Sequence, residues 1–325
     1  MSRIFDALQR LESERSGEDS TSLPQGPDLL RRAENRAAAR WEAAGSRSDL
    51  DVVETSLEEE IEVIEVAPLP AAAKPAPRAV ESLSNAKRAE ILEKFPSLKI
   101  SLAPQSRLVC LTDKESPTAE AIRLLGVRLR DIRRNRPLKK VLITSTIPQE
   151  GKSTISANLA CALALTADEK VLLVEGDLRR PSLLRMFGIE RIAGISECIR
   201  AEGRQLSGIY YLEEAGLWIL PAGKSSVNPL ELLQSHKLRS VMDQLATCFD
   251  WIIIDTPPVL PLADTSIWTR MADGVLLVTR QGTTQKHQLQ KGLEALDQKK
   301  LLGALLNGAV ASLYSGYYEN SSLSS

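Results

Sequence analysis

The chain has 325 residues, of which 43% are hydrophobic and 26% are charged, so it can bury a full core in one α/β domain with additional segments, or in two domains. Its longest apolar runs, such as ISANLACALAL, fall well short of the roughly 20 residues that a membrane-spanning helix needs. The start is charged throughout and shows no secretory signal, and the four cysteines form no C-x-x-C pair. We therefore expect a cytoplasmic protein with reduced thiols and no structural zinc site.

The N-terminal quarter differs in composition from the rest. Residues 1–85 hold 17 acidic and 10 basic side chains, and eight acids with no base fall between Asp49 and Glu65. A Pro/Ala-rich stretch, APLPAAAKPAPRAV, follows. Such a segment buries too little apolar surface to offset chain entropy, so we predict a disordered linker over 18–85.

Residues 1–17 are the exception within this segment. Ile4, Phe5, Leu8 and Leu11 share one helical face, which predicts a short amphipathic helix. Such a helix is typical of a docking element for a partner or a membrane edge, but a fraying terminus or a helix packed on its own domain gives the same pattern.

From residue 86 the chain alternates between helical and strand patterns. We predict helices at 116–134, 151–166, 229–246 and 283–298, and buried strands at 139–145, 170–177, 251–255, 274–279 and 301–307. Apolar strands that alternate with helices indicate a mostly parallel, doubly wound sheet with helices on both faces and right-handed crossovers. We assign 86–313 to this domain and 314–325 to a flexible tail.

A phosphate-binding loop is predicted where the first strand meets its helix. The stretch STIPQEGKST (145–154) ends in Gly151-Lys152-Ser153, although Thr146 stands where the usual G-x-x-x-x-G-K-[ST] pattern has its first glycine. Backbone N–H groups and the helix N-terminus of such a loop face phosphates. The residues expected to bind nucleotide are Pro148, Gln149, Glu150, Gly151, Lys152, Ser153 and Thr154.

Acidic residues follow two other predicted strands. VLLVEGDLRRP brings Glu175 and Asp177 to the end of one strand, with Arg179 behind them, and FDWIIIDTPP ends another strand at Asp255. Ligands bind at the carboxyl ends of the strands in such sheets. Carboxylates there can hold Mg²⁺ or accept a proton from an attacking hydroxyl. The three elements in order predict a site for ATP and Mg²⁺.

Residues 107–318 resemble the bacterial tyrosine kinases of polysaccharide biosynthesis. The likeness is carried by VLLVEGDLRRP, DWIIIDTPPVLPLADTSIWTRMADGVLLVTR, LPAGKSSVNPLELLQS and GALLNG. It implies a P-loop NTPase fold and ATP-dependent tyrosine autophosphorylation that regulates exopolysaccharide or capsule synthesis and chain length. It also implies a homo-oligomer with protein-tyrosine substrates, recruited to the inner face of the plasma membrane by a membrane polysaccharide co-polymerase.

The same resemblance implies a role for individual residues. Lys152 would hold the phosphates, Ser153 the Mg²⁺, and Asp177 and Asp255 would complete the metal and base site. The remaining assignments are catalytic roles for Glu175 and Arg179, an adenine contact for Asn307, oligomer contacts for Glu120 and Arg123, and phosphoacceptor roles for Tyr314, Tyr317 and Tyr318 of the tail.

Three departures from the family pattern keep alternatives open. Glu175 replaces the first aspartate of D-x-D, Gln149 replaces a loop glycine, and Gly126 replaces the last arginine of E-x-x-R-x-x-R. A non-catalytic, nucleotide-binding scaffold would tolerate these changes. A partitioning ATPase of the MinD or ParA type is a further alternative, although Ile147 stands where those proteins carry an additional lysine.

The basic run 128–140 has no interleaved aromatic residues, so we do not expect nucleic-acid binding.

Overall fold

The computed structural model describes residues 60–64, 84–103, 105–166, 169–200, 206–224, 228–260 and 264–309. The predicted helix at 1–17 and the predicted tail with Tyr314, Tyr317 and Tyr318 lie outside the described residues, as does most of the predicted linker. No helix within the described ranges combines the length and apolarity that crossing a bilayer requires.

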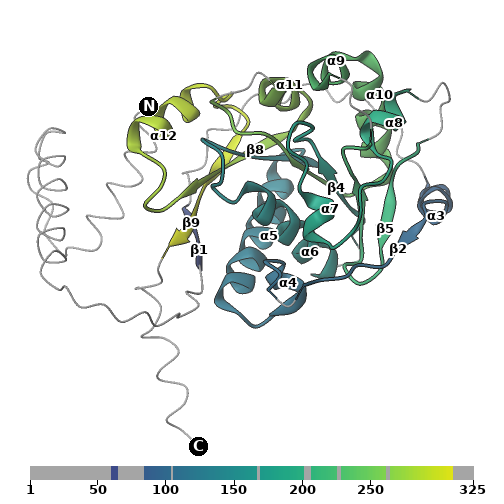
Figure 1. The fold of residues 1–325 in the computed structure, drawn as a ribbon, viewed down its shortest axis with the longest axis horizontal. Helices are drawn as coiled ribbons and strands as arrows, with labels where there is room; N and C mark the ends of the chain where they lie inside the picture. The colour runs from purple at the N-terminus through teal and green to yellow at the C-terminus, as the bar shows by residue number, and fades with distance from the viewer. Residues whose placement is uncertain are drawn as a thin grey trace, which may run out of the picture. The chain divides into compact units, whose positions relative to one another are not determined.

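A nine-stranded mixed sheet forms the centre of the described part, in the order β1-β9-β8-β3-β7-β4-β6-β5-β2 (Figure 1). The run from β9 to β6 is parallel, whereas β1 is antiparallel to β9, β5 is antiparallel to β6, and β2 is parallel to β5. The strands are β1 (Glu60–Ile64), β2 (Ser97–Leu98), β3 (Lys140–Ser145), β4 (Val171–Glu175), β5 (Tyr210–Leu212), β6 (Leu217–Leu220), β7 (Trp251–Asp255), β8 (Gly274–Arg280) and β9 (Leu301–Ala309). The predicted doubly wound architecture is confirmed.

Helices cover both faces of this sheet. Helices α4, α5 and α6 pack together on one face, and α9, α10 and α11 lie on the other (Figure 1). The helices are α3 (Asn85–Glu93), α4 (Val109–Thr112), α5 (Pro117–Asn135), α6 (Lys152–Thr166), α7 (Leu183–Met186), α8 (Ile195–Arg200), α9 (Pro229–Gln234), α10 (His236–Cys248), α11 (Asp264–Met271) and α12 (Lys286–Glu294).

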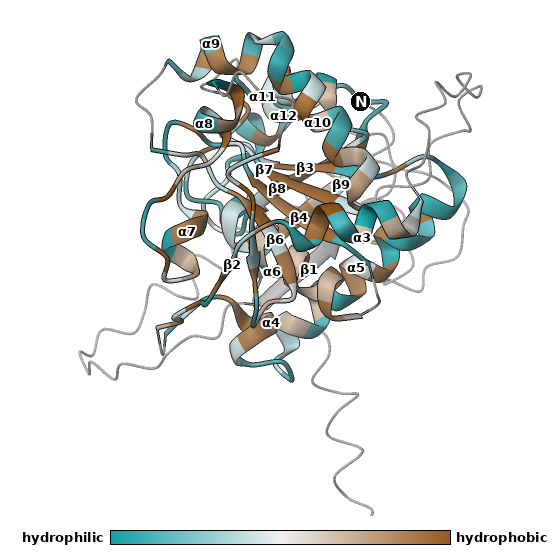
Figure 2. Cartoon of the chain, turned by 90° about the vertical axis from the view of Figure 1, so that its right-hand side faces the viewer, coloured by the Kyte–Doolittle hydropathy of each residue, from teal (hydrophilic) through white to brown (hydrophobic). Residues whose placement is uncertain are grey.

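The core follows from the apolar strands. Every residue of β4 and β7 is buried, because both faces of a central parallel strand are covered by helices. Figure 2 shows these strands and β3 as the most hydrophobic part of the chain. Helix α6 is apolar all round and is buried between the sheet and the amphipathic α5. All four cysteines are free and buried.

Two predictions about elements need correction. The helix predicted at 229–246 is two helices, because the extended backbone of Ser235 ends α9 and its hydroxyl accepts a hydrogen bond from the Leu238 N–H to cap α10. The linker predicted to be disordered over 18–85 contains a strand, β1, which pairs antiparallel with β9. In its sequence EIEVI, β-branched residues interleave with acids, a pattern that favours a strand once a partner edge is present.

Candidate nucleotide-binding and catalytic site

The phosphate loop lies where the sequence predicts it, between the end of β3 at Ser145 and the start of α6 at Lys152. Thr146, which replaces the usual first glycine, is buried, and its methyl group faces α12. A Cβ on Gly292 of that helix would lie only 3.1 Å from Cγ2 of Thr146. The side chain of Thr146 is therefore accommodated by a glycine on the opposite element.

Gln149 adopts the left-handed backbone conformation, with φ of 69°, and its side chain is exposed. This backbone conformation costs an L-residue with a Cβ roughly 1–2 kcal/mol, whereas glycine adopts it without that penalty. The conformation that this position requires thus explains why glycine is usual there. Glutamine satisfies it at the expense of local strain.

Glu150 holds the loop together through its buried carboxyl group. One oxygen accepts a hydrogen bond from the Ile147 N–H at 2.8 Å, and the other accepts one from the hydroxyl of Thr284, between β8 and α12. Burial raises the pKa of Glu150, and these hydrogen bonds oppose that increase. The side chain of Glu150 is thus engaged within the protein, and only its backbone can face a phosphate.

Asn307 on β9 fixes the same loop from the other side. Its Nδ2 donates a hydrogen bond of 2.9 Å to the carbonyl of Glu150. Gly151 has φ of 93°, and a Cβ at this residue would lie 2.1 Å from Nδ2 of Asn307, so a larger residue would be strained and would displace the Asn307 side chain. The structure gives Asn307 a loop-holding role, and its adenine contact stays a prediction.

Lys152 lies between Asp177, which follows β4, and Asp255, the last residue of β7. Its Nζ is 3.0 Å from Oδ2 of Asp177 and 3.7 Å from Oδ2 of Asp255. Burial lowers the pKa of Lys152, but the two carboxylates outweigh this effect, so the pKa is raised. The lysine is firmly charged, and its charge balances acids that would otherwise be unpaired in the interior.

Asp255 is fully buried at the end of β7. Its Oδ1 accepts a hydrogen bond of 3.3 Å from the hydroxyl of Ser156, and its Oδ2 has no hydrogen-bond partner among the described residues. Burial raises the pKa of Asp255, although Lys152 and the hydroxyl of Ser153 lower it. A buried carboxylate oxygen beside a phosphate loop, with an ion-pair partner in Lys152 but no hydrogen bond, suits a metal ion or a metal-bound water.

Glu175 and Arg179, both predicted to be catalytic, have structural partners. Oε2 of Glu175 accepts hydrogen bonds from the backbone N–H groups of Ser182 and Leu183, and so caps the short helix α7. Burial raises the pKa of Glu175 well above its usual range. Both Nε and Nη2 of Arg179 bind the buried carboxylate of Asp264 on α11, at 2.7 and 3.1 Å. The catalytic roles of Glu175 and Arg179 stay predictions.

The residues present fit a nucleotide with a divalent cation. No group of three or more His, Cys, Asp or Glu side chains in the described part of the chain could hold a metal ion. A cation at this site would take one or two carboxylates and the hydroxyl of Ser153, and the rest of its ligands would come from phosphates and water. Magnesium is usually bound in this way in phosphate-transfer sites.

Glu120 and Arg123 lie on the outer, solvent-facing side of α5. Nε of Arg123 donates a 3.0 Å hydrogen bond to Oε2 of Glu120 within the same helix. Leu124 and Val127 on this face are each 48% exposed. Gly126 is buried towards α6, where an added Cβ would make an ordinary 3.5 Å contact with Leu163.

Sequence reasoning missed the residues that support the site. The phosphate-loop motif does not include Thr284, Ser156 or Asp264. The folding of the chain brings these three residues to the site. The signal for Asp264 is weak: it is an acid in the first turn of a helix. Nε1 of Trp268 donates a hydrogen bond to the carbonyl of Gly176. No sequence pattern around Trp268 predicts this contact.

Comparisons with known proteins agree with this geometry. Residues 140–307 match the family model described as cellulose biosynthesis protein BcsQ. The tyrosine-protein kinase YwqD of Bacillus subtilis is 36% identical over 218 residues, which cover 66% of this chain and 92% of YwqD. The tyrosine-protein kinase CpsD of Streptococcus pneumoniae serotype 4 is 37% identical over 173 residues, covering 52% of this chain and 76% of CpsD.

Solved structures show the same relationship. The kinase domain of Escherichia coli tyrosine kinase ETK has a TM-score of 0.59 and 28% identity, covering 63% of this chain and 82% of that domain. The chimerical protein CapA2B2 has a TM-score of 0.58 and 30% identity, covering 68% of this chain and 97% of the chimera. Together with the P-loop NTPase fold described above, and with the match of residues 140–307 to the BcsQ family model, these similarities show that the chain belongs to the bacterial tyrosine kinases.

Proposed function

We propose that the protein is an ATP-dependent protein-tyrosine autokinase that phosphorylates Tyr314, Tyr317 and Tyr318 in the tail of a neighbouring copy. The observation that carries this proposal is the position of Lys152, which lies beside the phosphate loop and between Asp177 and Asp255. Family membership supports the reaction class, and the cluster of tyrosines near the C-terminus supplies the acceptors.

In this reaction the tyrosine oxygen forms a bond to the γ-phosphorus while the bond from that phosphorus to the β–γ bridging oxygen breaks. The ammonium of Lys152 would hold phosphate oxygens, for which it would have to leave its contact with Asp177. The tyrosine proton would pass to a carboxylate, for which we assign Asp177, because Asp177 keeps 4% of its surface exposed whereas Asp255 is fully buried. Mg²⁺, held by Ser153 and Asp255, would supply charge neutralisation on the phosphates.

The nucleotide-bound protein would work as a homo-oligomer with a membrane polysaccharide co-polymerase as its activator, at the inner face of the plasma membrane. The outer face of α5, with Glu120, Arg123 and the exposed Leu124 and Val127, is our proposed oligomer contact. The role would be to regulate exopolysaccharide or capsule synthesis and chain length. Phosphate on the tail adds about −1.5 to −2 charge per tyrosine, which would favour disassembly.

The test is a phosphotyrosine map of the full chain after incubation with Mg-ATP, with and without the cytoplasmic segment of the co-polymerase. We expect phosphate on the three tail tyrosines, and no phosphate in the variants Lys152→Met and Asp177→Asn. A tail that stays unphosphorylated under both conditions would rule out the autokinase.

A second candidate is a non-catalytic scaffold that binds nucleotide. It is favoured by Glu175, whose oxygen caps α7 where the family pattern has an aspartate. The scaffold would be supported over the kinase if the protein binds Mg-ADP but forms no phosphotyrosine. Disassembly of the oligomer should then be the same in Asp177→Asn as in the unmodified chain.

A further inference from the structure

Strand β1 covers the outer edge of β9, although it comes from a segment that precedes β3 by about 75 residues. The register pairs Ile61 with Asn307, Glu62 with Leu306 and Ile64 with Ala304, with one irregularity between Glu60 and Ile61. Figure 1 shows β1 and β9 side by side. The acidic N-terminal segment thus extends the central sheet by one antiparallel strand.

The edge that β1 covers is a strand-accepting surface. β9 is the last strand on this side of the parallel run, and its outer backbone N–H and C=O groups would otherwise lack a ladder. Open edge strands of this length are covered or blunted in natural proteins, because they pair with other chains. Any added strand gains main-chain hydrogen bonds at such an edge, whatever its side chains are. Selectivity for one strand over another therefore has to come from the side chains on either side of the edge.

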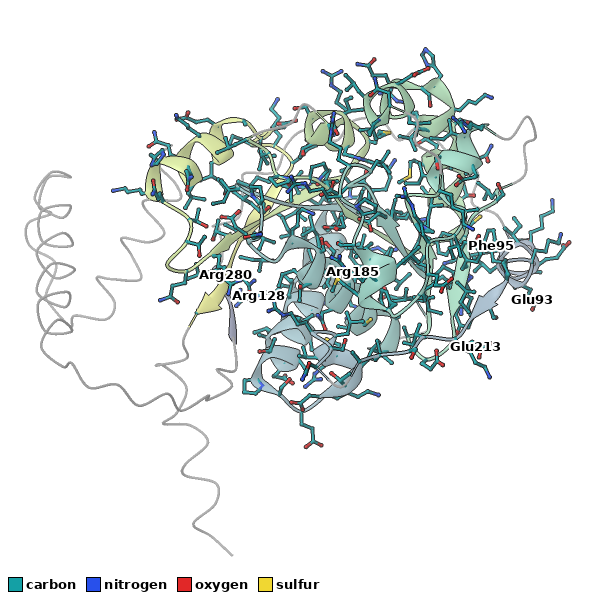
Figure 3. All side chains as sticks on the ribbon, viewed as in Figure 1. Glu93, Phe95, Arg128, Arg185, Glu213 and Arg280 are labelled. Atoms are coloured by element: carbon teal, nitrogen blue, oxygen red, sulfur yellow. The ribbon has the colours of Figure 1, made fainter. Side chains whose placement is uncertain are left out.

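The flanks of this edge are basic. Helix α5 packs against β1 and carries Arg128, whose Nη1 is buried without a hydrogen-bond partner among the described residues. On the other side, Arg280 of β8 is in register with Asn307 of β9. Figure 3 labels both arginines near the two strands. The segment 49–65, with eight acids and no base, has the charge that this edge would select.

The edge is also connected to the phosphate loop. Asn307 lies opposite Ile61 in the register of the two strands, and its side chain holds the carbonyl of Glu150 and packs against Gly151. A strand that pairs with this part of β9 and restricts its motion should therefore also restrict the motion of the phosphate loop. We propose that the outer edge of β9 is a docking site for the acidic, β-branched segment Glu60–Ile64 of the same chain, and that its docking holds Asn307 against the phosphate loop.

The occupant is the chain's own segment because that is the pairing the structure shows. The 19 residues between Ile64 and Ser84 could span roughly 60 Å when extended, so the same strand could also reach a neighbouring copy. The experiment must therefore separate pairing within one chain from pairing between two chains.

A disulfide tests the docking directly. Glu62 and Leu306 face each other in the register, and cross-strand partners have Cα separations that a disulfide can bridge. We expect the oxidised full chain of Glu62→Cys/Leu306→Cys to form an intrachain disulfide and to migrate as a monomer on a non-reducing gel. The matched control, Glu62→Cys/Leu302→Cys, places the second thiol four residues away along β9 and should stay reduced. A cross-linked dimer, or no cross-link, would overturn docking within one chain.

Proline substitutions test the connection to the loop. The carbonyl of Asn307 accepts a hydrogen bond from the Gln281 N–H on the β8 side, so the β9 residues that face β1 are Leu306 and Ala304, opposite Glu62 and Ile64. Glu62→Pro/Ile64→Pro removes the two backbone donors of β1 that face β9, whereas Glu62→Gln/Ile64→Val preserves the strand pattern. We expect the proline variant to speed hydrogen exchange about tenfold in both 301–309 and 146–151, and to weaken Mg-ADP binding about threefold or more, with no effect in the control. Faster exchange confined to β9, with unchanged loop exchange and affinity, would overturn the connection.

The measurement of Mg-ADP affinity depends on the proposed nucleotide site, whereas the disulfide experiment does not. If the unmodified chain fails to bind Mg-ADP, the proposed function fails, while the exchange and disulfide results still decide the docking of β1.

Discussion

Replacing Lys152 with methionine removes the positive charge that lies 3.0 Å from one carboxylate and 3.7 Å from another. At an effective dielectric of about 20, each attraction is worth about 4 to 6 kcal/mol before the desolvation of the lysine is subtracted. Removing one partner of a buried pair typically costs about 3 to 5 kcal/mol. We therefore expect the nucleotide-free variant to lose about 3 kcal/mol, which corresponds to a fall in Tm of about 6 to 12 °C for a domain of this size.

The pH dependence of this loss gives a second, independent readout. Burial raises the pKa of Asp255 in the folded state and Lys152 opposes that rise, so the variant should raise it further. A folded carboxyl with a raised pKa binds its proton more tightly than the unfolded chain does. The added instability should therefore be smallest near the ordinary carboxyl pKa and should grow as the pH increases above it.

Differential scanning calorimetry of the nucleotide-free proteins at pH values from about 5 to 8 measures both effects. Lys152→Arg is the matched control, because it keeps the charge and should stay close to the unmodified chain in Tm. Lys152→Met/Asp255→Asn should recover much of the lost stability without recovering nucleotide binding. A Tm for Lys152→Met within about 2 °C of the unmodified chain, or a deficit that does not change with pH, would refute this electrostatic account.

Three other changes have defined outcomes. Gln149→Gly should stabilise the chain by up to about 1 kcal/mol relative to Gln149→Ala in urea unfolding, because only glycine is unstrained at φ of 69°; equal stabilities would count against the strain. Gly151→Ala should abolish Mg-ADP binding in calorimetric titration through its clash with Asn307, and Asn307→Gly should restore part of it; tight binding by Gly151→Ala alone would contradict the packing of the loop. Glu175→Asp shortens the α7 cap by one methylene and should cost about 1 to 2 kcal/mol of unfolding free energy, so an unchanged or increased stability would show that the cap contributes nothing.

The sequence predicted the central sheet and the three elements at its carboxyl edge, because buried parallel strands are long apolar runs and the loop and acids follow them directly. Lys152, Asp177 and Asp255 meet in space for that reason alone. The short outer strands β2, β5 and β6 were missed, because two to four residues do not establish a period.

The long-range contacts of the site were beyond sequence reasoning. Glu150 precedes Gly151 in the loop and looks like a phosphate-facing residue, but the fold brings Thr284 to its carboxyl group from 134 positions away. Glu175 was predicted to be catalytic from its place in the motif, and its actual partners depend on how the chain turns into α7. The acidic composition of 49–65 predicted disorder throughout, since a strand pattern of five residues shows itself only when an edge is available to receive it.

The most direct test of the proposed kinase mixes two variants of the full chain with Mg-ATP. One copy carries Lys152→Met with an intact tail, and the other has an intact site with Tyr314, Tyr317 and Tyr318 changed to phenylalanine. We predict that phosphotyrosine forms on the tail of the Lys152→Met copy in the mixture, and on neither variant alone. A mixture without phosphotyrosine, when the unmodified chain phosphorylates its tail under the same conditions, would contradict transfer between copies, and phosphotyrosine on Lys152→Met alone would contradict the central role of the lysine.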